Sequence, residues 1–77
     1  MKYDKFIEYI LTGREIELRY KGENYFISQS DKGANIINNQ SNELQYYKDR
    51  EELVEQAKIF GKTLKQAWKD MVVDYVL

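Results

Sequence analysis

The chain of 77 residues contains no histidine, no cysteine and no proline. Histidine and cysteine supply most acid–base, nucleophilic and metal-binding side chains near neutral pH, so their absence excludes the usual catalytic sets and the common zinc, haem and iron–sulfur sites. Disulfide bonds are excluded as well. We therefore expect a protein with no metal and no cofactor, whose stability comes from apolar packing.

Charge of one sign and long hydrophobic runs are also lacking. Twelve Lys and Arg against 13 Asp and Glu leave a formal charge of −1, so no global field attracts nucleic acid or anionic lipid. No apolar run approaches the roughly 18 residues of a membrane span, and the N-terminal residues 1–5 lack the apolar stretch of a signal peptide. We expect a cytoplasmic protein that does not bind membranes.

Apolar residues make up 43% of the chain, which is enough for a folded core. The length of 77 residues predicts a single domain, 1–77. Residues 4–11 carry apolar side chains at helical spacing, which predicts a short amphipathic helix with Asp4 as its N-cap. Residues 15–20 alternate charged and apolar side chains, which predicts a strand. A two-residue turn at Lys21-Gly22 or at Gly22-Glu23 leads to a second strand over residues 25–29. Both turns bury the same face, which carries Ile16, Leu18, Tyr20, Tyr25 and Ile27.

The pattern after Ser30 is less regular. Residues 34–38 predict a weaker third strand. The meander has either three or four strands, and in the second case residues 44–47 form the fourth. Asp49 with an acidic first turn predicts a helix over residues 50–60 that ends at Gly61. Thr63 with Gln66 fits the capping box of a further helix, whose buried stripe consists of Leu64, Ala67, Trp68, Met71, Val72 and Tyr75.

The predicted fold is therefore α+β, with a short N-terminal helix, an antiparallel meander of three to four strands, and two C-terminal helices packed on the sheet. Whether residues 72–77 are helical or extended stays open.

Two motifs near Gly61 have structural explanations. Gly61-Lys62-Thr63 lacks the earlier glycine and the preceding strand of a phosphate-binding loop, so it predicts a helix stop and a cap. Ala57 and Gly61 partly match a helix-turn-helix. Four lysines without an intervening acid form a lysine stripe that could contact phosphates, although such lysines more often keep a helix soluble. The lysine stripe consists of Lys58, Lys62, Lys65 and Lys69.

A less ordinary feature is expected on the outer side of the sheet, where Glu15 and Glu17 serve as solubility charges. Large apolar side chains interrupt that polar side at Phe26, Ile37 and Tyr47. Gathered apolar side chains indicate a covered surface. Either the N-terminal helix covers them, or they bind a protein partner or a second copy of the chain.

Residues 15–28 (EIELRYKGENYFIS) and residues 51–68 (EELVEQAKIFGKTLKQAW), with their spacing, resemble short uncharacterised single-domain proteins of low-GC Gram-positive bacteria and their phages. The abundance of Lys, Ile, Tyr and Asn fits the AT-rich codons of such a source. The resemblance implies one compact domain and no particular activity. It also implies a mobile-element origin, in which small proteins often bind a host protein.

The main prediction is thus a non-enzymatic interaction or regulatory domain that binds another protein or forms a homodimer. The alternative is a nucleic-acid-binding accessory protein that uses the lysine stripe. A third, weaker reading is an enzyme that uses only carboxylates, lysine and tyrosine, for which no set of residues converges.

Overall fold

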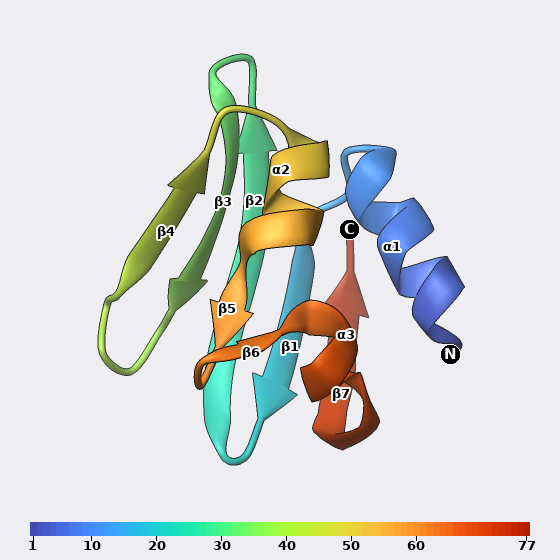
Figure 1. The fold of residues 1–77 in the computed structure, drawn as a ribbon, viewed down its shortest axis with the longest axis vertical. Coiled ribbons are helices and arrows are strands. Elements are labelled where there is room, and N and C mark those ends of the chain that lie inside the picture. Colours follow the sequence, from blue (N-terminus) through green and yellow to red (C-terminus); the bar gives the residue numbers. More distant parts are fainter.

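Five antiparallel strands form one sheet in the order β4-β3-β2-β1-β7, and the helices lie over one of its two faces (Figure 1). The computed structural model describes residues 1–77. The chain is a small α+β domain. Its elements in chain order are α1 (Tyr3–Leu11), β1 (Ile16–Tyr20), β2 (Glu23–Ser30), β3 (Gly33–Asn38), β4 (Leu44–Tyr47), α2 (Arg50–Gln56), β5 (Lys58–Ile59), β6 (Lys62–Thr63), α3 (Leu64–Ala67), the 3-10 helix η1 (Trp68–Asp70) and β7 (Met71–Val76).

The β1–β2 hairpin follows the predicted alternation. Tyr20 pairs with Glu23, so the loop is Lys21-Gly22, the first of the two turns that the sequence allows. Lys21 and Gly22 both have positive φ, 48° and 83°, as the tight primed hairpin turns require, and glycine adopts this conformation without steric cost. The predicted inward face is confirmed, because Ile16, Leu18, Tyr20, Tyr25 and Ile27 are all buried.

One apolar core fills the space between the sheet and the helical layer. It comprises 14 buried residues, and α1, α2 and α3 all contribute to it. Trp68 stacks on Phe6 of α1 with 5.0 Å between ring centroids, which ties the two ends of the chain together. Helix α1 begins one residue before Asp4, with Lys2 as an N-cap that makes no side-chain hydrogen bond, so the predicted Asp4 cap is wrong.

The C-terminal half corrects the predicted fold. The chain does not form two helices packed on a sheet of three or four strands. Helix α2 ends at Gln56, a β5–β6 hairpin turns at Phe60-Gly61, and α3 has only four residues. Strand β7 then pairs with β1 and adds a fifth strand to the sheet.

Side-chain caps fix both predicted helix starts in this half. Asp49 Oδ1 accepts the N–H of Glu52 at 2.8 Å. Thr63 Oγ1 accepts the N–H of Gln66 at 3.1 Å, while Gln66 Oε1 accepts the N–H of Thr63 at 3.0 Å, so the predicted capping box is confirmed. The longest helix has nine residues, and none of the helices has both the length and the apolar character needed to cross a membrane.

Candidate protein-binding surface

The outer face of the sheet, opposite the helices, is not covered by any other element. Helix α1 lies on the same side as α2, and its Phe6 and Ile10 belong to the single core (Figure 1). The explanation in which the N-terminal helix packs on the outer face is therefore excluded. Side chains that point outward from the sheet face solvent.

Apolar side chains of three neighbouring strands meet on this outer face. Phe26 of β2 pairs with Ile37 of β3, and Ile37 pairs with Leu44 of β4. Leu44 is 57% exposed, and Tyr46, the next outward residue of β4, is 55% exposed. Directly paired side chains lie within contact distance across antiparallel strands. We call Phe26, Ile37, Leu44 and Tyr46 the outer-face patch.

Tyr47 does not belong to this patch. It pairs with buried Ala34, packs against the core from the helix side, and donates its hydroxyl hydrogen to Gln45 Oε1 at 2.7 Å. Burial, with a smaller contribution from the Glu52 carboxylate, raises the pKa of Tyr47 above its ordinary value. The structure thus brings together Phe26 and Ile37 of the predicted trio, and places Tyr47 on the opposite face.

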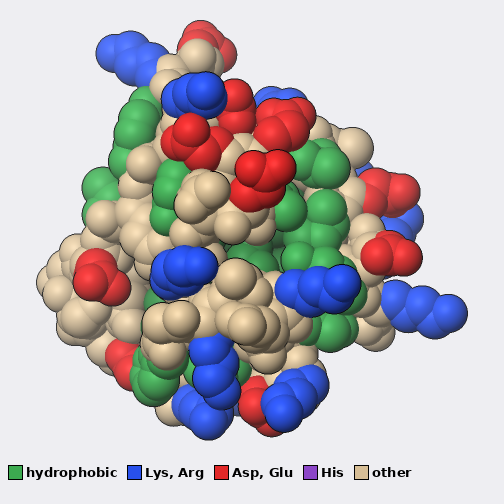
Figure 2. Space-filling view, in the orientation of Figure 1, with side chains coloured by type: hydrophobic (Ala, Val, Ile, Leu, Met, Phe, Trp, Pro, Cys, Tyr) green, Lys and Arg blue, Asp and Glu red, His purple; other side chains and the backbone are tan.

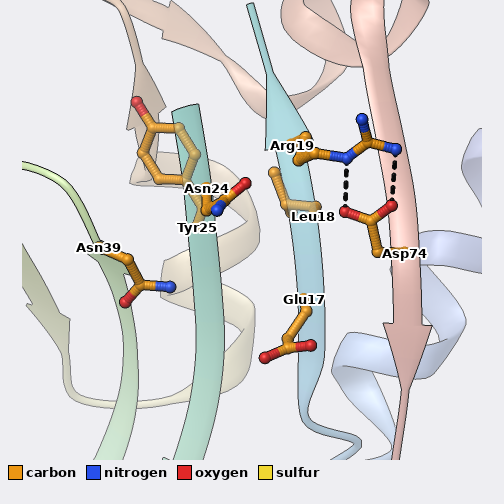
Figure 3. Close-up of a pocket in the computed structure, with 7 residues that line it drawn as sticks. All are labelled: Glu17, Leu18, Arg19, Asn24, Tyr25, Asn39 and Asp74. Carbon is orange, nitrogen blue, oxygen red and sulfur yellow. Dashed lines mark hydrogen bonds and ion pairs between the residues drawn. The ribbon is translucent and has the colours of Figure 1, made fainter. Parts of the chain in front are cut away.

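A polar hollow of about 310 Å³ lies beside the patch on the outer face (Figure 3). Arg19 of β1 donates two hydrogen bonds of 2.8 Å to the carboxylate of Asp74 in β7. These hydrogen bonds lower the pKa of Asp74, and the same pairing raises the pKa of Arg19. The hollow is lined by Glu17, Leu18, Arg19, Asn24, Tyr25, Asn39 and Asp74.

Glu17 connects the hollow to the outer-face patch. Its position in β1 pairs with Phe26 on one side and with Tyr75 of β7 on the other. Glu17 forms no ion pair. Of the charged residues in β1 and β7 that point outward, two are acidic and one, Arg19, is basic. The outer face therefore presents apolar side chains next to a free carboxylate.

The lysine stripe lies elsewhere, on the helix-bearing side of the molecule. Lys58 and Lys62 are in the β5–β6 hairpin, Lys65 is in α3 and Lys69 is in η1. The helix–turn–helix that would present them is absent, since the hairpin separates α2 from α3. No stripe lysine forms an ion pair. In Figure 2 basic side chains gather in the lower part of the view, around the β5–β6 hairpin and α3, and acidic side chains gather over α2.

No group of three or more acidic side chains is placed to hold a metal ion. Comparisons with protein-family models, with curated proteins and with solved structures found no match to this chain.

Proposed function

We propose that this protein is a non-enzymatic protein-binding domain and that the outer-face patch is its contact surface. The observation that carries the proposal is the row of half-buried Phe26, half-buried Ile37 and exposed Leu44 across three strands, extended by exposed Tyr46, with no element packed over it. Contiguous apolar surface of this kind on a small domain marks interaction sites. Aromatic anchors such as Phe26 and Tyr46 are typical of binding hot spots.

The affinity available from the patch can be estimated from its exposure. Burying a whole large apolar side chain contributes about 1.5 to 3 kcal/mol. Leu44 and Tyr46 are each just over half exposed, so covering either one contributes about 1 kcal/mol, before the entropic cost of association. The partner must therefore also satisfy the polar rim of the patch.

The charges beside the patch define the chemistry of the partner. The free carboxylate of Glu17 lies next to Phe26, and the outward acids of β1 and β7 outnumber the base. A partner surface with an apolar centre and a basic rim complements this arrangement. Two copies packed face to face would place acid against acid, so the occupant is a different protein. A bacterial host protein is the partner that the mobile-element origin expected from the sequence favours.

A capture experiment with matched variants tests the proposal. The wild-type chain, the double variant Phe26→Ser/Leu44→Ser and a control variant Leu11→Ser are immobilised and exposed to an extract of a low-GC Gram-positive bacterium. Leu11 is an exposed apolar residue of α1, on the other side of the sheet. We expect a partner that the wild type and the control retain and that the double variant loses.

Titration of the identified partner with the Glu17→Lys variant then tests the role of the charge beside the patch. Glu17→Lys is expected to weaken binding and to reduce its sensitivity to salt, because a basic rim would meet a like charge. Retention of every captured protein by the double variant, once circular dichroism shows that it is folded, would refute the role of the patch.

Nucleic-acid binding is the second candidate function, and the absence of ion pairs at the lysine stripe favours it. Phosphate contacts weaken steeply with salt. Fluorescence anisotropy with labelled single-stranded and duplex DNA at about 20 and 200 mM salt tests this function. Binding at low salt that Lys62→Gln/Lys65→Gln abolishes would support it. No binding at low salt would remove it.

A further inference from the structure

The free edge of β4 offers backbone groups that no part of the chain uses. Strand β4 ends the sheet and has one neighbour, β3. The N–H of Asn38 donates to the carbonyl of Glu43 at 2.9 Å. Backbone groups along an antiparallel ladder alternate between the two sides of a strand. The backbone N–H and C=O groups of Gln45 and Tyr47 therefore point toward β3, whereas those of Leu44 and Tyr46 point away from β3 to the free edge. Figure 1 shows no element beyond β4 at this edge.

We propose that β4 pairs antiparallel with β4 of a second copy, which makes one continuous ten-stranded sheet in a symmetric dimer. The two-fold axis passes by Gln45, so that Leu44 of each copy lies opposite Tyr46 of the other. In this register Leu44 and Tyr46 of each strand both donate a backbone N–H and accept at a backbone C=O across the edge, which gives four backbone hydrogen bonds. A register centred on Leu44 or on Tyr46 would give only two between the strands themselves.

Side chains support the same register. Leu44 and Tyr46 both point to the outer face, so the pairing places the two residues opposite each other twice. The Tyr46 ring leans over Gly33 of β3, where its hydroxyl donates to the carbonyl of Lys32, so Leu44 of the second copy meets the base of the Tyr46 side chain. Glu43 precedes the strand and Lys48 follows it. Antiparallel pairing therefore brings Glu43 of one copy to the end of the strand where Lys48 of the other lies. The only ion pair of Lys48 within the chain is a long one, 4.0 Å from Glu52.

The two edges of the sheet differ in how they are protected. Proline, charge, bulges, covering elements and short strand length are the features that limit edge pairing. Strand β7 has a bulge at its pairing with Glu17 and Leu18, and it carries Asp74. Figures 1 and 3 both show α1 beside it. Strand β4 is short, with four residues, but it contains no proline and no charged residue, so it is the edge that a second copy can extend through a small interface.

The dimer goes beyond the proposed function, because it rests on the backbone of β4 rather than on the face of the sheet. Its interface is small, so we expect a dissociation constant between about 10 µM and 1 mM. Sedimentation velocity over a dilution series reaching about 1 mM should show dimers at the upper end. A strict monomer at that concentration would overturn the proposal.

Charge exchange tests the register. Glu43→Lys and Lys48→Glu should each weaken self-association, by about tenfold at low salt, because each variant brings like charges together twice. An equimolar mixture of the two variants restores both opposite-charge contacts and should form a heterodimer as readily as the wild type. Both side chains are exposed, so neither change disturbs the core. Wild-type association of the single variants, or no recovery in the mixture, would refute this register.

A backbone variant separates the edge from the face. Leu44→Pro removes an outward N–H that the fold does not use, and edge strands tolerate proline there. We expect a folded monomer. Phe26→Ser, in contrast, should dimerise like the wild type while losing the partner of the proposed function. If Leu44→Pro fails to fold, the charge exchange still decides. Loss of the dimer in Phe26→Ser would show that the face, and not the edge, holds the copies together.

Discussion

The buried hydroxyl of Tyr20 provides the sharpest test of the packing. Tyr20 on β1 is 1% exposed, and its hydroxyl has no hydrogen-bond partner. The ring is well held, because Phe60 meets it edge-on at 5.4 Å and the Lys21 ammonium lies 5.7 Å from its centroid. Tyr20→Phe keeps all of these ring contacts and removes only the unpaired oxygen.

The expected gain follows from two opposed terms. Leaving a buried polar group unpaired costs about 1 to 3 kcal/mol. The void left by a hydroxyl, on the order of 10 Å³, costs about 0.2 kcal/mol at about 24 cal/mol per Å³. The first term is larger, so Tyr20→Phe should stabilise the fold by about 1 kcal/mol or more. For a domain of this size each 1 kcal/mol raises the Tm by about 4 to 8 °C.

Urea denaturation followed by Trp68 fluorescence and by circular dichroism measures this change. Tyr47→Phe is the matched control, because it makes the same chemical change where the hydroxyl donates to Gln45 at 2.7 Å. The control should lose about 0.5 to 1.5 kcal/mol. Destabilisation of Tyr20→Phe to the same extent as the control would show that the Tyr20 hydroxyl is satisfied in solution, and it would refute the reasoning.

Three further changes have definite expected outcomes. Gly33→Ala should cost about 3 kcal/mol or more in urea denaturation, because φ is 148° and a Cβ would lie 2.3 Å from the carbonyl oxygen of Tyr47. Thr63→Ala should cost about 1 kcal/mol through loss of the α3 cap, whereas Thr63→Ser should cost little. Arg19 lowers the pKa of Asp74, so the pair stabilises the fold above the ordinary value of 3.8, and this stability is lost as the pH falls through the lower folded pKa. Asp74→Asn should therefore flatten the acid limb of the urea midpoint against pH, and an unchanged limb would contradict the assignment.

Local patterns explain why the first hairpin and two of the helix starts were predictable. The alternation in residues 16–20 and the turn at Lys21-Gly22 act over a few residues, so strand, face and hairpin follow from sequence. Asp49 and Thr63 cap helices through neighbours three residues away. Each of these features is complete within one short segment, so no distant contact can reverse it.

The sequence left residues 72–77 open between helix and strand because the pattern over β7 is ambiguous. The bulge puts both Asp74 and Tyr75 outward, which breaks the alternation that would mark a strand. The same residues fit a helical stripe that continues from Leu64. What decides in favour of a strand is pairing with β1, including the contact between Arg19 and Asp74, 55 residues apart. A one-dimensional pattern does not contain that pairing.

The candidate patch was half predictable for a related reason. Phe26 and Ile37 face outward because a short turn joins their strands and fixes the register. Tyr47 follows a polar loop of residues 39–43, whose geometry decides which side of β4 faces the core. Asn38 organises this loop by accepting the N–H groups of Gln40 and Ser41 at 2.9 and 3.1 Å. A shift of one residue there would exchange Tyr46 and Tyr47 between the faces.

The outer-face patch and the β4 edge share Leu44 and Tyr46, which couples the two proposals. In the dimer the two patches adjoin across the two-fold axis and form one apolar surface with Glu17 at either end. A partner that contacts both halves binds the dimer in preference to the monomer, and by linkage it strengthens dimerisation by the same factor. A weak edge contact would then be sufficient, because the partner itself would supply the remaining free energy of assembly.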